Sequence, residues 1–253
     1  MTGRALRVAT YNVHGCVGMD GRLDVDRVAA VIRELDADVV GLQEVDGGFR
    51  REVDQLPHLA AATGMQIVCG ATRRNERGTF GNALLSRLPV LASRTADLSC
   101  RGREERGALD AAVDCDGVAV RVVATHFGLH AWERREQVRG LLQLVQRDPG
   151  VPIVVLGDFN EWSIINRTVR VLDAKLGASV AVRSFPSWWA LFALDRLWAR
   201  PRGSLEAVWA HRSRLARVAS DHLPVVGRLS TGWPAQPARA GYRADYWTDW
   251  VRT

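Results

Sequence analysis

The sequence predicts an α/β protein in which two mixed sheets form a sandwich within one domain. Three observations lead to this prediction. A strand, a helix and a second strand follow one another over residues 6–44, which favours a parallel pair joined by a right-handed crossover. A second predicted helix, at 132–146, precedes another buried strand at 152–156. Between these units, Asp116 and Gly117 separate two apolar runs, which is typical of a β-hairpin. Hairpins mixed with crossover helices favour a layered α/β sandwich.

The first predicted strand covers residues 6–11, where apolar and polar residues alternate. It is followed by Asn12 and His14, so the strand delivers polar side chains at its carboxyl end. A Gly-rich loop at 15–21 comes next. His14 is expected to be a structural or supporting residue rather than a metal ligand.

The predicted helix that follows begins after Asp24, whose carboxylate is suited to capping the helix N-terminus. Apolar residues then recur at helical spacing, at Val25, Val28, Ala29, Ile32 and Leu35. The next strand, at 38–44, is short and apolar, and it ends on an acid, Glu44. This completes the first strand-helix-strand unit.

The remaining elements continue this mixed pattern. Further strands are predicted at 83–86, 109–115, 118–125, 152–156, 194–199, 205–211 and 224–229, and helices at 132–146 and 164–175. No repeat or linker divides the chain, so we expect one domain over residues 1–230. Residues 231–253 differ because they combine prolines with several Trp and Tyr residues. We expect this tail to pack on the domain or to lie at an interface, and its poor amphipathic periodicity favours packing.

Composition excludes several classes of protein. The chain has 253 residues, 47% of them hydrophobic and 25% charged, which supports a substantial core. No apolar run approaches the ~20 residues that span a membrane, and the N-terminus has no signal-like apolar region. Four scattered cysteines form no C-x-x-C pair and are expected to be reduced, in or near the core. A cytoplasmic protein is therefore expected, with peripheral membrane contact through the aromatic tail as an alternative.

The net charge of +6 is a weaker signal. Lys175 is the single lysine, so 33 of the 34 basic residues are arginine. This skew fits a GC-rich genome better than a recognition surface, because the basic residues form no block and many lie beside acids. The charge suits an anionic phosphate substrate, but it does not separate nucleic acid from lipid.

Polar side chains lie at the ends of one predicted strand after another. Asn12, His14, Glu44, His126, Asp158 and Asn160 end or follow strands, whereas Asp195 opens a late strand and Asp221 and His222 precede the final one. If these strand ends share an edge, the side chains line one cleft. Carboxylate and amide oxygens without thiolates suit Mg²⁺ or Mn²⁺ rather than zinc. Such a site suits phosphoryl chemistry, in which a metal offsets charge and a His or Asp handles a proton.

Six segments in order resemble the endonuclease/exonuclease/phosphatase superfamily and span nearly the whole chain to residue 229. They are the stretches TYNVHG at 10–15, QEVD at 43–46, GNALLS at 81–86, THFG at 125–128, GDFNE at 157–161 and SDHLP at 220–224. Each is weak alone, whereas six in register are specific. The resemblance implies a four-layer αββα sandwich of two mixed sheets flanked by helices. It also implies a Mg²⁺-dependent hydrolase of phosphate esters, with Mn²⁺ as an alternative ion.

The resemblance also implies roles for individual residues. Glu44 matches the principal metal ligand, with Asn12 beside it and Asp221 as a further acid on the metal side. His222 matches a general base or transition-state stabiliser, oriented by Asp195.

The remaining matched residues concern the reacting phosphate. Asp158 matches the acid that orients water or protonates the leaving group, and the direction is left open. Asn160 and His126 are expected to bind phosphoryl oxygens during catalysis. Arg106 is a candidate phosphate contact, with an ordinary ion pair to Glu104 or Glu105 as the alternative.

Three functions follow from these assignments. The favoured one is a phosphodiesterase acting on a phospholipid headgroup or a small phosphorylated molecule by attack of water on phosphorus. The alternatives are a DNA or RNA nuclease and a catalytically dead binding module. Loops expected at 72–81 and 184–189 leave little room for the insertions with which duplex nucleases enter grooves. Trp188 and Trp189 suit a lipid interface or stacked nucleobases equally well.

Overall fold

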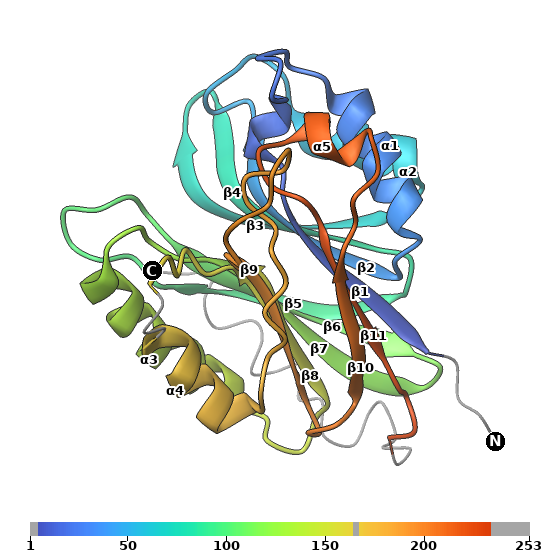
Figure 1. The fold of residues 1–253 in the computed structure, drawn as a ribbon, viewed down its shortest axis with the longest axis vertical. Coiled ribbons are helices and arrows are strands. Elements are labelled where there is room, and N and C mark those ends of the chain that lie inside the picture. Colours follow the sequence, from blue (N-terminus) through green and yellow to red (C-terminus); the bar gives the residue numbers. More distant parts are fainter. Residues whose placement is uncertain (1–4, 164–166, 234–253) are drawn as a thin grey trace.

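The computed structural model of the protein describes residues 5–163 and 167–233, and within them it contains two sheets and five α-helices (Figure 1). The six-stranded sheet has the order β10-β11-β1-β2-β4-β3, with strands Leu205–Ala210, Val225–Leu229, Leu6–Asn12, Val39–Gly47, Gly78–Ser86 and Gln66–Asn75. The five-stranded sheet has the order β5-β6-β7-β8-β9, with strands Val90–Asp97, Gly107–Cys115, Val118–His126, Ile153–Asp158 and Asp195–Arg200. The helices are α1 (Val25–Leu35), α2 (Gln55–Thr63), α3 (Ala131–Gln146), α4 (Arg167–Leu176) and α5 (Ala216–Ala219), and a 3-10 turn covers His14–Cys16.

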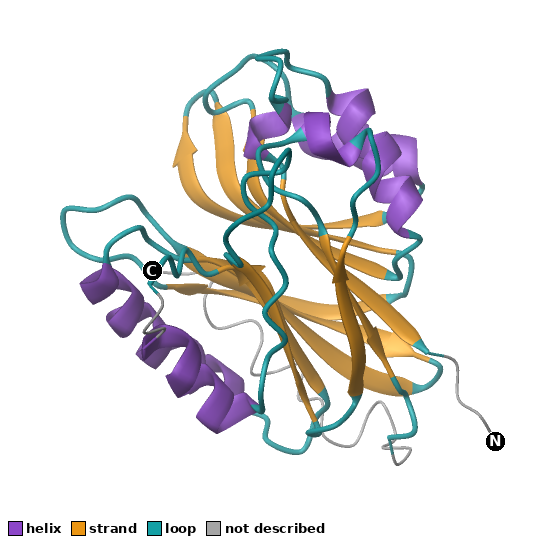
Figure 2. Cartoon of the chain, viewed as in Figure 1, coloured by secondary structure: helices purple, strands orange, loops and turns teal. Residues whose placement is uncertain are grey.

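The two sheets face each other, and helices cover both outer faces (Figure 2). Helices α1, α2 and α5 lie on the six-stranded sheet, whereas α3 and α4 lie on the five-stranded sheet (Figure 1). This arrangement confirms the predicted four-layer αββα sandwich. None of the helices in the described part of the chain is both long and apolar enough to cross a membrane.

The core between the sheets is built from short aliphatic side chains of both inner faces. Val8 and Leu84 of one sheet pack in the same buried cluster as Leu156 and Leu197 of the other. Gly41 of β2 faces this layer, and a Cβ on it would lie 2.2 Å from the Leu156 side chain. The sheets therefore approach closely, which brings the ends of their central strands to one rim.

Parallel pairing at the centre of each sheet sets the direction of these strand ends. Strand β1 runs parallel to β2, as predicted, and β7 runs parallel to β8 with His126 opposite Asp158. The Asp116–Gly117 turn joins antiparallel β6 and β7, which confirms the predicted hairpin. The carboxyl ends of β1, β7 and β8 consequently carry polar residues singled out in the sequence. Strand β2 does not end on Glu44 as predicted: it continues to Gly47, and Glu44 lies at an irregularity within it.

Some predicted boundaries differ in the structure. Residues 72–81 are not a loop: β3 and β4 form a hairpin that leaves only Glu76 and Arg77 between the strands. Strand β5 and helix α2 were also not predicted. Strands β3 and β5 lie at the edges of their sheets, where few side chains are buried, so their apolar pattern is weak. Helix α2 was missed because Pro57 lies within its first turn.

The structure also bears on the predicted Asp24 cap, the cysteines and the C-terminal residues. Asp24 caps α1, with its carboxylate accepting from the Arg27 amide at 2.8 Å. All four cysteines are free, but Cys69 is exposed, so the expectation of core thiols is wrong for that residue. The predicted start of a helix at 164 falls outside the described residues, as does the tail beyond residue 233. Trp233 itself packs against the core between the sheets. The domain boundary at residue 230 stays a prediction.

A buried ion network fastens α3 to the five-stranded sheet. Asp110 of β6 and Arg121 of β7 are fully buried and 2.6 Å apart, and Arg94 of β5 lies 2.9 Å from the same carboxylate. The Arg121 guanidinium also donates to the carbonyl oxygens of Leu144 and Val145, in the last turn of α3. Arg121 therefore links the buried carboxylate of Asp110 to the last turn of α3.

We expect Asp110→Ala to lower the free energy of unfolding by about 3–5 kcal/mol, because it removes the fully buried carboxylate that Arg121 and Arg94 share and leaves the partly exposed Asp148 to face both cations. The exposed pair between Arg228 and Glu206 provides the control, since Glu206→Ala is expected to change stability by less than about 1 kcal/mol. Urea denaturation measures both values. Equal effects of the two substitutions would contradict the structural role of the buried network.

Candidate active site

The carboxyl ends of the central strands surround a cavity of about 260 Å³. Its lining residues come from both sheets and from the connections after them: Glu44, Arg50, Glu104, Arg106, His126, Leu129, Asp158, Asn160, Trp162, Phe185, Asp221 and His222. Seven of the residues predicted from the sequence line this cavity: Glu44, Arg106, His126, Asp158, Asn160, Asp221 and His222. Two more, Asp195 and Asn12, bond directly to residues that line it.

His222 and Asp195 form a buried hydrogen-bonded dyad. The Nδ1 atom of His222 lies 2.8 Å from Asp195 Oδ2, and its Nε2 atom lies 3.6 Å from Asp158 Oδ2. The Ser184 hydroxyl donates to the same Asp195 oxygen at 2.6 Å. Phe185 packs on the imidazole, with 4.8 Å between ring centroids. The ring of His222 is therefore held in one orientation, with its Nε2 atom toward the cavity and Asp158.

Asn12 joins the two carboxylates that come from opposite sheets. Its Nδ2 atom donates to Glu44 Oε1 and to Asp158 Oδ2, both at 3.1 Å. Glu44 lies at an irregularity in the β2–β4 pairing and has a φ of 58°, which is unfavourable for a residue with a side chain. Bulges of this kind redirect a side chain out of the normal alternation. Local strain thus brings Glu44 into the cavity.

Two side-chain hydrogen-bond donors face the ring of His126, one at each nitrogen. Arg106 Nη1 lies 3.2 Å from its Nδ1 atom, and Asn160 Nδ2 lies 3.1 Å from its Nε2 atom. A neutral imidazole accepts at only one of its two nitrogens. One of the two donor contacts is therefore unsatisfied by the ring, and an acceptor oxygen entering the cavity would meet donors from Arg106, Asn160 and His126.

Burial and charge set the ionisation of these groups. Burial alone would lower the pKa of His222. The carboxylates of Asp195 and Asp158 together outweigh this effect and raise the pKa to about 10. Burial raises the pKa of Asp158 to about 6, with His222 acting against that shift. The pKa of His126 falls well below 6.5 because of burial first and Arg106 second. The free protein at neutral pH therefore combines a protonated His222 with a neutral His126.

The oxygen donors near Glu44 fit a hard divalent cation. Glu44 Oε1 accepts one hydrogen bond, from Asn12, and the carboxylate faces the cavity. Asn12 Oδ1 accepts from the His14 amide at 3.0 Å, and Asp221, partly exposed, lines the same cavity. Carboxylate and amide oxygens are the donor set that Mg²⁺ or Mn²⁺ prefers.

A second group of potential ligands lies beside the first. Atoms of Asp158, Asp195 and His222 all lie within 4.8 Å of one another. Because Asp195 Oδ2 is already bonded to His222 and Ser184, we interpret this group as the proton-handling part of the site rather than as a cation site.

Arg106 forms the ion pair that its sequence position suggested, with its Nη2 atom 3.1 Å from Glu104. It also faces His126, and its contact with phosphate stays a prediction. His14 lies at the rim, exposed, with its Nδ1 atom 3.2 Å from the Val17 carbonyl oxygen and 3.9 Å from Asp221. The supporting role of His14 stays a prediction. Asp20 pairs with Arg27 at 2.7 Å.

Several residues of the cavity were not identified from the sequence. They are Arg50, Leu129, Trp162 and Phe185, together with Ser184 behind Asp195. Each lies in a connection rather than at a strand end. The Phe185–Phe192 bridge returns the chain beside Asp195, and the exposed pair Trp188 and Trp189 lies within it. No local pattern signals such contacts, because they join residues that are distant in sequence.

Two sheets that bring a His–Asp dyad, a second buried acid and a Glu–Asn pair to one rim define the class of α/β-sandwich hydrolases that cleave phosphate esters. The comparisons with known proteins support this class. The chain belongs to the endonuclease/exonuclease/phosphatase family, whose sequence model matches residues 9–222.

Individual relatives agree with this assignment. The chain is 31% identical over 244 residues to the uncharacterized protein YbhP of Escherichia coli K12, covering 89% of this chain and 96% of that protein. Among solved structures, it is 26% identical to an endonuclease/exonuclease/phosphatase of Beutenbergia cavernae, with a TM-score of 0.69 and coverage of 90% and 72% of the two chains. The mannosyl-6-phosphatase Bt3783 of Bacteroides thetaiotaomicron shares the fold, with a TM-score of 0.72, 17% identity and coverage of 88% and 98%.

The raised pKa of His222 makes a prediction about stability. Its folded value of about 10 lies above the ordinary 6.5, so the stabilisation is fully present below pH 6.5 and is lost as pH rises through about 10. We expect the difference in free energy of unfolding between the protein and His222→Gln to shrink over that interval. Urea titrations of both proteins with a chelator present measure it, and titrating groups that do not contact His222 cancel in the difference. A difference that stays constant or grows with pH would contradict the assignment.

Proposed function

We propose that the protein is a divalent-metal-dependent phosphodiesterase that acts on a phospholipid headgroup or a small phosphorylated molecule. The observation that carries this proposal is the set of donors on Arg106, Asn160 and His126, which converge without an acceptor that satisfies all of them. A phosphoryl oxygen supplies that acceptor. It would lie between the Glu44 side of the cavity and the His222 dyad.

Each residue then has a role in the attack of water on phosphorus. Glu44, Asn12 and Asp221 would hold Mg²⁺ or Mn²⁺, which offsets the charge of the phosphoryl oxygens. Asp158 and His222 face each other across 3.6 Å, so together they move the proton of the water and of the leaving group. Asp195 fixes the imidazole through its 2.8 Å hydrogen bond.

The surroundings of the cavity favour a compact or lipid substrate. Trp162 packs between Phe185 and Phe192, with ring centroids 5.3 and 5.2 Å apart, and forms an aromatic border beside the dyad. Trp188 and Trp189 are 57% and 63% exposed in the same connection. Indole rings at a surface suit the boundary between lipid headgroups and acyl chains.

Two further observations support a small phosphorylated substrate. The cavity of about 260 Å³ has the size of a small phosphorylated group. One of the solved structures that share the fold is named as a mannosyl-6-phosphatase. A peripheral membrane position through the aromatic residues would be compatible with this function.

The same exposed rings are the observation that favours the nuclease alternative, because aromatic side chains also stack on unpaired bases. A catalytically dead binding module is disfavoured, since the dyad, the second acid and the Glu44–Asn12 pair are all present and in contact. The two substrate classes separate in an activity screen over DNA, RNA, phospholipids and inositol phosphates with Mg²⁺, Mn²⁺ or a chelator.

We expect His222→Ala and Asp158→Ala each to lower kcat for bis(p-nitrophenyl) phosphate by about 10²–10⁴, because each removes half of the proton-handling pair. His58→Ala is the control, since His58 lies on the surface beside Asp26 and away from the cavity. Steady-state kinetics with Mg²⁺, Mn²⁺ and chelator measure the effect. Absence of metal-dependent turnover by the unmodified protein on every ester of the screen would overturn the enzymatic proposal.

The salt dependence of activity distinguishes a compact phosphate ester from a nucleic acid as the substrate. We expect kcat/KM on the preferred substrate to fall by less than about tenfold between about 50 and 200 mM salt, because a compact ester engages few cations, whereas a nuclease contacting 6–10 phosphates loses about 10³–10⁵ in affinity. Kinetics on micellar phospholipid and on DNA over this salt range provide the measurement. A steep loss together with a preference for DNA or RNA would favour the nuclease.

A further inference from the structure

The carboxylate of Glu104, at the mouth of the cavity, forms ion pairs with three arginines. Glu104 Oε1 lies 3.3 Å from Arg50 Nη2 and 3.6 Å from Arg73 Nη1, and its Oε2 atom lies 3.1 Å from Arg106 Nη2. Glu104 is on the connection between β5 and β6, and its side chain is 37% exposed. Three guanidinium groups around one exposed carboxylate are more than an ordinary surface ion pair requires.

This cluster belongs to the catalytic cavity. Arg50, Glu104 and Arg106 all line it, together with His126 and Asp158. Arg106 connects the two regions, because its Nη1 atom faces His126 while its Nη2 atom faces Glu104. An anion in the position of the Glu104 carboxylate would therefore be the immediate neighbour of a phosphoryl group held by His126 and Asn160.

Aromatic rings hold two of the arginines independently of Glu104. The guanidinium of Arg50 lies 3.8 Å from the centre of the Phe80 ring, and that of Arg73 lies 4.6 Å from the centre of the Phe49 ring. Stacking on an aromatic face fixes a guanidinium plane and reduces its hydration. The positions of these cations thus persist when the Glu104 side chain moves away.

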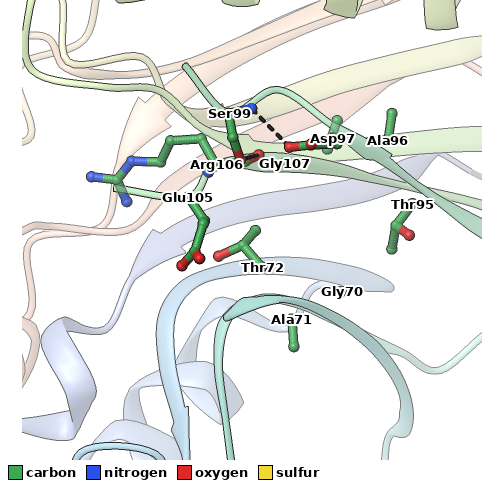
Figure 3. A pocket seen from close by; sticks show the side chains of 11 residues that line it. Gly70, Ala71, Thr72, Thr95, Ala96, Asp97, Ser99, Glu105, Arg106 and Gly107 are labelled. Atoms are coloured by element: carbon green, nitrogen blue, oxygen red, sulfur yellow. Dashed lines mark hydrogen bonds between the residues drawn. The ribbon is translucent and has the colours of Figure 1, made fainter. Parts of the chain in front are cut away.

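The hollow on the other side of Arg106 does not offer the same chemistry. Figure 3 shows a pocket lined by Thr72, Thr95 and Asp97, with the Arg106 guanidinium pointing away from these residues. The carboxylate of Glu105 also lines that pocket. Acids and hydroxyls without a facing cation disfavour an anion there, so the cationic cluster faces the catalytic cavity.

We propose that Arg50, Arg73 and Arg106 form a second anion subsite beside the reacting phosphate, and that Glu104 occupies it until a substrate arrives. The substrate is accordingly a phosphate ester that carries a second phosphate-like anion. This proposal rests on the proposed function, since it names the substrate class of the same site. A phosphate has more charge and more acceptor oxygens than one carboxylate, so it competes well for planar guanidinium groups.

Displacement of Glu104 requires little free energy. The ion pairs of Glu104 with Arg50 and Arg73 are partly exposed and therefore weak, and the released carboxylate regains its hydration. The buried Arg106 guanidinium keeps an anionic partner, because the incoming anion replaces the carboxylate. A substrate with a single phosphate leaves Glu104 in place and gains nothing from Arg73. Glu104 therefore also acts as a selectivity device, because it closes the subsite to uncharged groups.

The test compares inhibition constants and calorimetric affinities of two ligands that differ by one phosphate, myo-inositol 1-phosphate and myo-inositol 1,4-bisphosphate. In Glu104→Gln, we expect the bisphosphate to bind about tenfold more tightly than in the unmodified protein, while the monophosphate changes by less than about twofold. In Arg73→Gln, we expect the bisphosphate alone to weaken. Glu105→Gln is the matched control: Glu105 pairs with Arg73 at 3.2 Å but does not line the catalytic cavity.

The possible outcomes are distinct. Equal effects of Glu104→Gln on both ligands, or no preference for the bisphosphate in any variant, would overturn the subsite. A thymidine dinucleotide with two phosphates identifies the source of the second anion: a response to Glu104→Gln as large as that of the bisphosphate supports the subsite but assigns it to a neighbouring backbone phosphate. Turnover of bis(p-nitrophenyl) phosphate, measured in parallel, reports on the hydrolase proposal separately, because calorimetric binding does not depend on turnover.

Discussion

The buried carboxylate of Asp158 is the group on which the rest of the site depends. An ionised acid in this position is unfavourable, and burial accordingly raises its pKa to about 6. The surrounding residues offset that penalty: Asn12 donates to one oxygen, the backbone amide of Asn160 donates to the other, and His222 supplies positive charge. These partners come from β1, from the chain after β8 and from the connection before β11. Both sheets must therefore be closed against each other before Asp158 has its full environment, which links the packing of the sandwich directly to its chemistry.

Backbone strain at the same rim has a related origin. Glu44 and Asn160 both have positive φ angles, of 58° and 49°, and His14 and Cys16 do so as well. Such conformations are unfavourable by about 1–3 kcal/mol each and persist where the surrounding structure determines them. Gln55 provides one such constraint, because its side chain donates to the Gly15 carbonyl oxygen and accepts from the Asp46 amide. Helix α2 thus supports the turns that follow β1 and β2, although it contributes no residue to the cavity.

The sequence predicted the centre of the fold better than its edges. The strand-helix-strand unit, the Asp24 cap and the Asp116–Gly117 hairpin follow from local rules of periodicity and turn chemistry, and the structure contains all three. Strands β3 and β5 have one exposed edge and few buried side chains, so their apolar signal is weak. In the site, strand ends identified the acids and histidines. Ser184, Arg50 and the threefold pairing of Glu104 escaped notice because they depend on the paths of long connections.

The net charge of the whole chain does not describe the charge of the cavity. The sum of +6 describes the whole chain, whereas the cavity lining has more acids than arginines: Arg50 and Arg106 face Glu44, Glu104, Asp158 and Asp221. A phosphate ester therefore enters a site that already holds carboxylates, and it binds only where cations are not fully committed to them. The exposed Glu104 holds its three arginines by interactions that solvent weakens, whereas Asp158 and Asp195 are buried and fixed. The difference in burial between these acids determines which carboxylate can yield its position to an anion and which must remain to move a proton.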